Sequence, residues 1–209
     1  VVYGAANGDL IDAFTRNDKT RYIAMMHEQA GGFAAEGFSK ISGNIGVAIA
    51  TSGPGGMNFV TPIGNCFYDS VPCLFITGQI KTRYMRPNKD IRQIGFQETD
   101  IVDIVSSITK YAKLIDDPEE IKYELEKAIS IATSGRPGPV LLDLPIDIQK
   151  ADIDPNLLKS FNRPKLDNLY NKVSIDKQIF EFLDDLSKSQ RPGLLVGGGV
   201  RMAGASKEM

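Results

Sequence analysis

The chain has 209 residues, 42% of them hydrophobic and 24% charged, which is the balance of a globular protein and excludes a disordered or fibrous chain. At about 150 residues per domain, this length predicts one full domain and a remainder. The formal net charge is only −2, so the chain offers no broad positive field for nucleic acid. No apolar run approaches the roughly 18 residues of a membrane-spanning helix, so we expect neither a membrane span nor a nucleic-acid partner.

A single histidine and two cysteines limit the site chemistry. Cys66 and Cys73 give too few soft ligands for a structural zinc, and a Ser-His-Asp site would have to use His27. We therefore predict no metal site within this chain. Two unpaired cysteines, and a start at Val1 without a charged and apolar leader, predict a reducing, cytoplasmic location.

Short apolar runs alternate with stretches of helical period along most of the chain. We predict strands at Val1–Tyr3, Tyr22–Met26, Gly46–Thr51, Cys73–Thr77, Thr109–Ile115 and Val140–Leu144. We predict helices at Asp9–Arg16, Glu28–Ser42, Asn58–Tyr68 and Pro118–Thr133. Apolar strands that alternate with helices indicate an α/β fold, a parallel sheet with helices on both faces. In such a sheet, ligands collect at the carboxyl ends of the strands.

The helix at Pro118–Thr133 has the clearest boundaries, because proline suits a first turn and Gly135 ends the pattern. Acidic residues in its first turn also suit the positive end of the helix dipole. Residues at helical spacing predict one apolar stripe that faces the core: Ile121, Leu125, Ala128, Ile129 and Ala132.

Beyond Pro145 the alternating pattern loosens, and we predict three parts of the chain. Residues 1–150 form a first domain, 151–190 a linker with a helix, and 191–209 the truncated start of a second α/β domain. We expect the helix at Ser174–Lys188 and a strand at Leu194–Val196. The glycines after this strand do not complete a dinucleotide fingerprint, because Met202 stands where a glycine is required.

Glu28 begins a predicted helix of unusual composition. A lone glutamate in a first turn can simply complement the helix dipole. This helix, however, keeps many small residues despite the glycine penalty of about 1 kcal/mol: Ala30, Gly31, Gly32, Ala34, Ala35 and Gly37. Such a helix suits a place where a backbone, another helix or a ligand approaches closely, and it would enclose Glu28.

Two further segments have both a structural and a functional interpretation. Thr51-Ser52-Gly53-Pro54-Gly55-Gly56 is either a tight turn or a glycine-lined backbone that lets a flat ligand approach. It is not a phosphate-binding P-loop, because no Gly-Lys-Ser/Thr follows. Phe96-Gln97-Glu98-Thr99 contains a glutamine that in isolation would be an ordinary polar surface group.

The chain resembles the amino-terminal, pyrimidine-binding domain of the thiamine-diphosphate enzymes of the acetolactate synthase, pyruvate oxidase and benzoylformate decarboxylase family. The resemblance rests on the three motifs around Glu28, Gly53 and Gln97. It is extended by Asp69-Ser70-Val71-Pro72, Ile76-Thr77-Gly78-Gln79 and Thr133-Ser134-Gly135-Arg136-Pro137-Gly138-Pro139-Val140. The matching motifs follow in order from about Val1 to Ile148.

The resemblance implies that this domain holds the aminopyrimidine ring of thiamine diphosphate. The family residue that matches Glu28 hydrogen-bonds a ring nitrogen and promotes formation of the ylid that attacks a 2-keto acid such as pyruvate. The same matches imply that Gly53, Pro54 and Gly55 line the cofactor pocket. They also imply that Gln97 lies beside the cofactor and the substrate.

The resemblance also implies a larger enzyme. In the family, the diphosphate and its magnesium are bound by a carboxyl-terminal domain that this chain lacks and that usually comes from a partner subunit. We therefore expect a homo-oligomer with its active site between subunits, and an inactive fragment if this chain stands alone. The expected reaction passes a two-carbon acyl carbanion to a carbonyl acceptor, as in acetolactate synthase.

The segment from Gln79 to Gln97 departs from the family pattern, since it is longer by several residues and rich in basic side chains. It is either a solvated loop or a site for an anionic acceptor such as a nucleotide-linked keto-sugar, with Lys81, Arg83 and Arg86 as the contacts. A non-catalytic binding module that kept the fold is a further alternative.

FAD is a second cofactor that the resemblance leaves open. Ser70 and Arg136 match positions at which flavin-containing members touch FAD. Arg136, beside a proline and a glycine, is equally suited to anchoring a turn.

Overall fold

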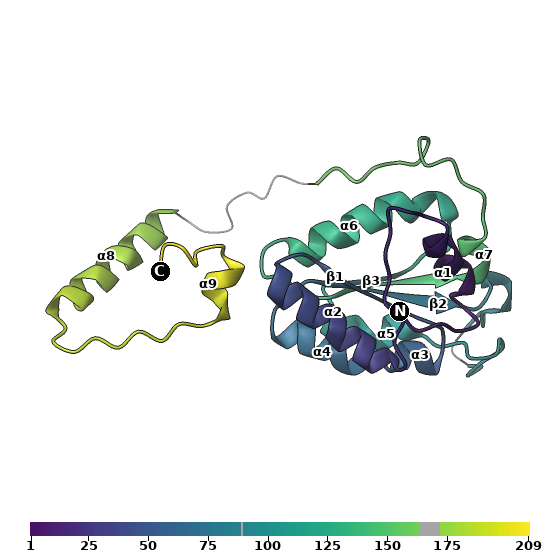
Figure 1. Cartoon of the computed structure of the whole chain (residues 1–209), viewed down its shortest axis with the longest axis horizontal. Helices are drawn as coiled ribbons and strands as arrows, with labels where there is room; N and C mark the ends of the chain where they lie inside the picture. The colour runs from purple at the N-terminus through teal and green to yellow at the C-terminus, as the bar shows by residue number, and fades with distance from the viewer. Residues whose placement is uncertain (89, 164–171) are drawn as a thin grey trace. The chain divides into compact units, whose positions relative to one another are not determined.

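The computed structural model describes residues 1–88, 90–163 and 172–209. The chain divides into two compact units, Val1–Arg163 and Pro164–Met209 (Figure 1). This division falls within the linker expected over residues 151–190. The domain boundaries given above remain predictions.

The first unit is built on a sheet of four parallel strands: β1 (Gly46–Ala50), β2 (Cys73–Gln79), β3 (Tyr111–Leu114) and β4 (Val140–Pro145). Their order in the sheet is β1-β2-β4-β3. Every residue of β2 and of β4 is buried, as expected for central strands that are covered on both faces. The predicted parallel α/β fold is confirmed.

Alternate residues of the strands pack against opposite layers of helices (Figure 1). One face is covered by α2 (Glu28–Ser42), α3 (Pro54–Met57), α4 (Val60–Tyr68) and α5 (Ile101–Val105). The other face is covered by α1 (Gly8–Thr15), α6 (Ile121–Thr133) and α7 (Ile146–Gln149). Three short 3-10 helices complete the unit: η1 (Thr82–Tyr84), η2 (Ser106–Ile108) and η3 (Pro118–Glu120).

The small residues of α2 serve helix packing. A Cβ added at Gly32 would lie 2.4 Å from Cγ of Pro62 in α4, so only glycine allows the two helices to approach this closely. At the amino end of β1, a Cβ on Gly46 would overlap the carbonyl oxygen of Ala35. The sequence predicted that another element approaches this helix closely, and the structure shows that α4 and β1 do so.

The strands predicted at Val1–Tyr3 and Tyr22–Met26 are wrong, because the structure has no regular strand there. The two segments lie next to each other and to β1 through a few backbone bonds. The amino group of Val1 donates to Ile23 O at 2.9 Å. Val2 N donates to Ile49 O at 3.0 Å, and Met25 N donates to Val1 O at 2.8 Å. These bonds do not continue into a ladder, so the apolar residues stay extended without forming sheet.

Two helix predictions also need correction. The helix predicted from Asn58 is divided into α3 and α4, and it begins earlier, at Pro54. In α6, Ala128 and Ala132 are buried, but Ile129 is 40% exposed, and Ile131 packs against the core instead. The residue missed on the buried side of α6 is Glu124, which accepts hydrogen bonds from Tyr111 Oη at 2.6 Å and Lys113 Nζ at 2.9 Å.

The second unit contains two helices among its described residues, α8 (Lys172–Lys188) and α9 (Gly198–Met202). The first confirms the helix predicted at Ser174–Lys188. The strand predicted at Leu194–Val196 is wrong: these residues are exposed, with Leu195 at 99%, and no described strand pairs with them. In the described parts of the chain, none of the helices combines the length and the apolar character needed to cross a bilayer.

Candidate functional site

The sheet topology brings the glycine motif and the helix that begins with Glu28 to one edge. Segment Thr51–Gly56 directly follows β1, so it lies at the carboxyl ends of the strands. Helix α2 precedes β1 and ends near its amino end, so α2 begins at the same edge. His27 starts that helix, since its Nδ1 accepts a hydrogen bond from the backbone N of Gln29 at 3.2 Å. Glu28 therefore stands in the first turn, beside the glycine motif.

The carboxylate of Glu28 is half-buried and held from one side. Its Oε2 accepts a hydrogen bond from Asn58 Nδ2 at 2.9 Å. Its Oε1 lies 3.4 Å from the position that a Cβ on Gly55 would occupy. Among the described residues, no donor bonds Oε1. One oxygen of the carboxylate is thus fixed by the protein, and the other remains available to a ligand.

The glycines of this turn are required by contacts within the chain. Gly53 has φ +61°, and a Cβ there would lie 2.8 Å from Gln97 Cβ and 3.0 Å from Gln97 O. A Cβ on Gly55 would lie 2.7 Å from Thr51 Cγ2. Pro54, between them, is exposed and opens helix α3. These contacts support the interpretation as a tight turn, and the approach of a flat ligand to this backbone remains a prediction.

Gln97 reaches the same turn from a distant part of the chain. It is half-buried and has φ +61°, an unusual conformation for a residue that has a side chain. Its neighbour Phe96 is 83% exposed. The structure thus joins five predicted residues and one unexpected residue in what we call the edge cluster: Glu28, Gly53, Pro54, Gly55, Asn58 and Gln97.

Asn58 is the member of the edge cluster that sequence reasoning missed. Its position just after a glycine turn, at the end of α3, was the available signal. A single asparagine there is usually read as a polar helix end. Only the fold shows that it faces Glu28, which lies 30 residues earlier.

A buried polar network lies in the sheet beside the edge cluster. Asp143 of β4 is 2% exposed and accepts hydrogen bonds from Thr77 Oγ1 at 2.7 Å and Gln79 Nε2 at 2.9 Å. Desolvation raises the pKa of Asp143 to about 7, although these two hydrogen bonds act in the opposite direction. Gln79 Nε2 also donates to Thr99 O at 2.8 Å, so this network supports the segment that follows Gln97.

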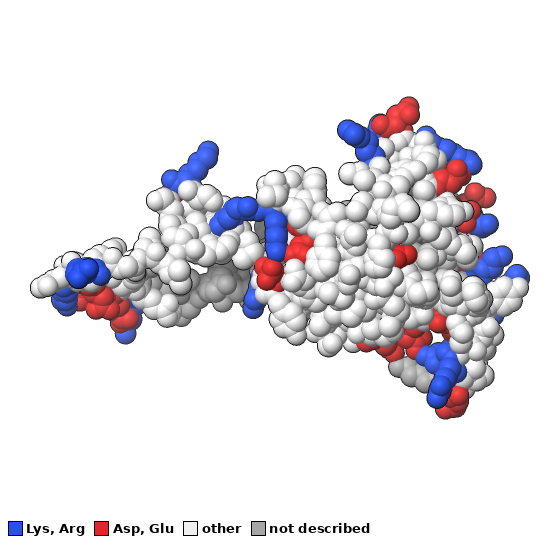
Figure 2. All heavy atoms as spheres, turned by 60° about the horizontal axis from the view of Figure 1, so that its bottom comes forward, with Lys and Arg blue, Asp and Glu red and all other residues white. Residues whose placement is uncertain are grey.

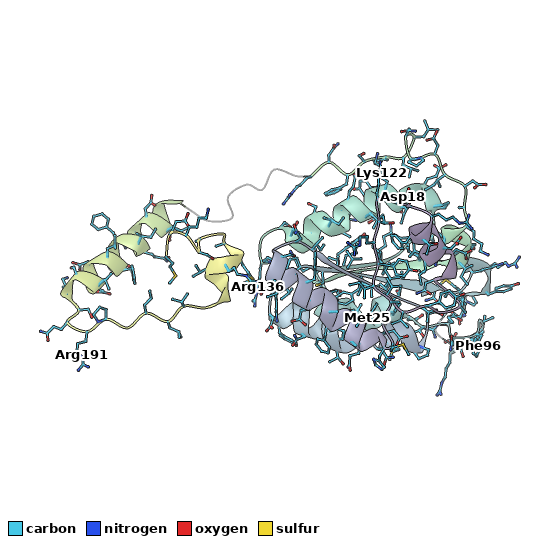
Figure 3. The ribbon with its side chains drawn as sticks, in the orientation of Figure 1. Asp18, Met25, Phe96, Lys122, Arg136 and Arg191 are labelled. Carbon is cyan, nitrogen blue, oxygen red and sulfur yellow. The ribbon has the colours of Figure 1, made fainter. Side chains whose placement is uncertain are left out.

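Ser70 and Arg136 lie together, but at the opposite edge of the sheet. Arg136 Nε donates to Ser70 Oγ at 2.6 Å, and the two residues precede β2 and β4. Figure 3 shows Arg136 and Phe96 at opposite ends of the first unit. Ser70 is 4% exposed and Arg136 is exposed, so only the guanidinium is open to a ligand.

The three predicted acceptor contacts differ in their surroundings. Arg86 forms an ion pair with Asp100 and donates from Nη1 to Ile91 O at 2.8 Å. Arg83 is exposed, with its guanidinium carbon 4.5 Å from the centre of the Tyr84 ring. Lys81 makes no ion pair with any described residue. Arg83 also donates from Nη2 to Tyr84 Oη at 2.8 Å. Arg86 therefore stabilises its own loop, whereas Arg83 is held by its neighbour and Lys81 has no described ion-pair partner.

Residues 1–104 match the family model described as thiamine pyrophosphate enzyme, N-terminal TPP binding domain. Similar curated proteins include the chloroplastic acetolactate synthase of Arabidopsis thaliana, which is 41% identical over 196 residues, 94% of this chain and 28% of the relative. The acetolactate synthase large subunit of Corynebacterium glutamicum is 37% identical over 214 residues, all of this chain and 33% of the relative. The chain thus spans about a third of the length of the curated relatives it matches.

Proposed function

The chain belongs to the thiamine pyrophosphate enzymes of the acetolactate synthase type, as their N-terminal domain, and we propose that the edge cluster binds the aminopyrimidine ring of thiamine diphosphate. The observation that carries this proposal is the Glu28 carboxylate, which stands at the carboxyl edge of the sheet with one oxygen fixed by Asn58. Its second oxygen is available to a ring nitrogen. Ligands of parallel α/β sheets gather at this edge.

The residues present fit that ring. A flat heterocycle with nitrogen atoms needs a hydrogen-bonding partner and an adjacent surface that has no protruding side chains. Glu28 supplies the first, and the turn Gly53-Pro54-Gly55, in which only Pro54 carries a side chain, would supply the second. Pro54 and Gln97 would close the pocket on either side of the glycines.

When bound, thiamine diphosphate supplies a carbon nucleophile that attacks the carbonyl of a 2-keto acid. The contribution of this chain is to orient the ring and to hold a proton at the Glu28 carboxylate. Asn58 keeps that carboxylate turned toward the pocket. Gln97 would contact the keto acid from the opposite wall, because its backbone is fixed against Gly53.

For the whole protein, we propose a transfer of a two-carbon unit from pyruvate to a second carbonyl compound, as the names of the relatives suggest. The relatives do not favour the nucleotide-linked keto-sugar as acceptor. The ion pair of Arg86 with Asp100 removes one of its three expected contacts. Both Glu28 and Gln97 are retained, which argues against a non-catalytic binding module.

We further propose that a second copy of the protein covers α2. The exposed side of this helix is apolar along its length: Ala30, Phe33, Ala34, Gly37, Phe38 and Ile41. Figure 2 shows few charged side chains over the side of the first unit that carries α2 and α4. Because α2 begins with Glu28, a subunit packed on it would place its own residues next to the edge cluster.

Three finer assignments complete the proposal. Magnesium and the diphosphate would bind a carboxyl-terminal domain, since the relatives are about three times as long as this chain. FAD would contact the exposed guanidinium of Arg136, and a flavin absorbance spectrum of the purified full-length protein tests this. A reducing, cytoplasm-like compartment suits the buried free thiols of Cys66 and Cys73.

The test compares Glu28→Gln with Glu119→Gln in the full-length protein. Glu119 is an exposed glutamate in the first turn of another helix, so both variants lose the same dipole interaction. We expect Glu28→Gln to lower pyruvate turnover at least about 100-fold, the scale of one acid–base contact, and Glu119→Gln to leave it unchanged. Equal turnover in the two variants would overturn the assignment of Glu28.

A further inference from the structure

Glu98 is a buried carboxylate that the proposed function does not use. It is 6% exposed, and its carboxylate accepts three backbone hydrogen bonds. Oε1 accepts from the N of Arg86 at 2.6 Å, and Oε2 accepts from the N of Ile94 at 2.8 Å and the N of Gly95 at 3.3 Å. Burial of a carboxylate is unfavourable unless such charge-assisted bonds compensate it, so these contacts hold Glu98 firmly.

The three bonds fasten both ends of one loop. Arg86 opens the segment 86–98, whereas Ile94 and Gly95 lie near its end, so the single carboxylate ties the two ends together. The backbone N of Glu98 also donates to Gly95 O at 3.1 Å. The ion pair of Arg86 with Asp100 reinforces the closure.

Gln97 lies between the hydrogen bonds of Glu98 and the glycine turn. Its φ of +61° is strained for a residue with a side chain, so its neighbours must hold it there. On one side, its Cβ and carbonyl oxygen pack against Gly53. On the other side, the chain continues directly into Glu98. A loop that opened at Glu98 would release Gln97 from the turn.

We infer that Glu98 is a positioning residue for Gln97: it ties Arg86 to Ile94 and Gly95 so that the Gln97 side chain faces the 2-keto acid. The inference rests on the proposed function, because it takes Gln97 as the contact with the 2-keto acid. Glu98 itself touches no reacting atom. It acts through the backbone that it fixes.

The test uses the full-length protein with Glu98→Gln, Gln97→Ala and the double variant. A glutamine at 98 keeps the size of the side chain but replaces one carboxylate oxygen with an NH2 group, which cannot accept a hydrogen bond. The backbone N–H groups that this oxygen bonded lose their acceptor, so one end of the loop is released. Glu124→Gln is the matched control, because Glu124 is a buried carboxylate, 3% exposed, in α6. Amide hydrogen exchange at Arg86, Ile94 and Gly95 reports loop opening independently of activity.

We expect Glu98→Gln to raise the KM for the 2-keto acid about tenfold or more, with faster exchange at these amides. Glu124→Gln should lower stability without changing KM. If Glu98 acts through Gln97, the double variant should have a KM within about twofold of that of Gln97→Ala.

Two results distinguish a failure of the positioning role of Glu98 from a failure of the proposed substrate site. If Gln97→Ala raises KM and Glu98→Gln does not, although its amides exchange faster, the positioning role is overturned and the substrate site stands. If Gln97→Ala leaves KM unchanged as well, the assignment of the substrate site itself is overturned.

Discussion

Asn58 donates a hydrogen bond to Glu28 across 2.9 Å, from the end of the glycine turn to the first turn of α2. The same domain contains a second bond of this kind, in which Asn65 Nδ2 donates to Glu36 Oε1 at 2.7 Å. Both bonds connect α2 to the segment that follows β1. Only the first lies at the carboxyl edge of the sheet, so a comparison of the two bonds tests whether Asn58 serves the site or only the stability of the fold.

The first prediction uses this pair of asparagines. Asn58→Ala should lower pyruvate turnover of the full-length protein about tenfold, equivalent to about 1.4 kcal/mol, because Glu28 loses the bond that orients it. Asn65→Ala should reduce the unfolding free energy by a similar amount, about 1–2 kcal/mol, and leave turnover unchanged. Steady-state kinetics and urea denaturation of both variants check this. Equal loss of turnover in both would mean that Asn58 has a structural role only.

The second prediction concerns two glycines with positive φ. Gly43→Ala should cost about 1–2 kcal/mol of stability, because Gly43 has φ +74° and ψ 0°, in the left-handed region. Gly53 has φ +61° and ψ −125°, outside that region, so the backbone cost of Gly53→Ala should be at least as large. Gly53→Ala should cost about 1–3 kcal/mol more and also impair turnover, since its Cβ would press on Gln97. Nothing lies within 4 Å of a Cβ at Gly43, so that variant should keep normal turnover. An active Gly53→Ala enzyme would disprove the contact with Gln97.

The third prediction is a pH dependence of stability set by Asp143. Burial raises the pKa of its carboxyl to about 7 in the folded chain, above the value of about 4 in the unfolded chain. Between these values the folded state retains a proton that the unfolded state has lost. This group therefore lowers the unfolding free energy by up to about 1.4 kcal/mol for each unit that the pH rises from about 4 to about 7.

Asp143→Asn should remove this contribution. The asparagine can accept from Gln79 and donate to Thr77, so the network is retained while the titration is lost. Denaturant titrations of the wild type and the variant from pH 4 to pH 8 measure the difference. If the two proteins show parallel pH dependence, the group that titrates is not Asp143.

The fourth prediction tests the second copy on α2. Phe33 and Ile129 are both 40% exposed, the first on α2 and the second on α6, on the other face of the sheet. Phe33→Asp should dissociate the full-length protein at micromolar concentration and abolish activity, because it places a charge in an apolar interface. Ile129→Asp should leave the oligomer intact. Sedimentation velocity distinguishes the variants, and a Phe33→Asp protein of unchanged size would reject α2 as the interface.

The sequence predicted the central strands well because β2 and β4 are buried on both faces and therefore apolar throughout. It failed for Val1–Tyr3 and Tyr22–Met26, which are apolar but are joined by only a few backbone bonds that form no ladder. A segment becomes a regular strand only where a neighbouring strand continues beside it and forms a ladder of hydrogen bonds. The local amino-acid composition does not show whether such a neighbour is present. The predicted buried side of α6 was partly wrong for a related reason: Ile129 is exposed and Glu124 is buried. Tertiary contacts of Glu124 with β3 decide which side of α6 is buried.

In the candidate site, the family motifs identified Glu28, the glycine turn and Gln97, but they did not show how these residues meet. The contact of Gln97 with Gly53 joins segments more than 40 residues apart. Asn58 follows the glycine turn and Glu98 stands inside the Gln97 motif, but sequence position did not reveal the groups that the fold brings to their side chains. Arg86 was expected either to be solvated or to contact an anionic acceptor, and it instead pairs with Asp100 and bonds Ile91 O.

The most direct measurement is a crystal structure of the full-length protein with thiamine diphosphate bound. The role proposed for Glu28 requires its Oε1 to lie within about 3 Å of a nitrogen of the aminopyrimidine ring, with Asn58 still bonded to Oε2. A Glu28 side chain that points into solvent, or a ring bound away from Gly53 and Gly55, would contradict it.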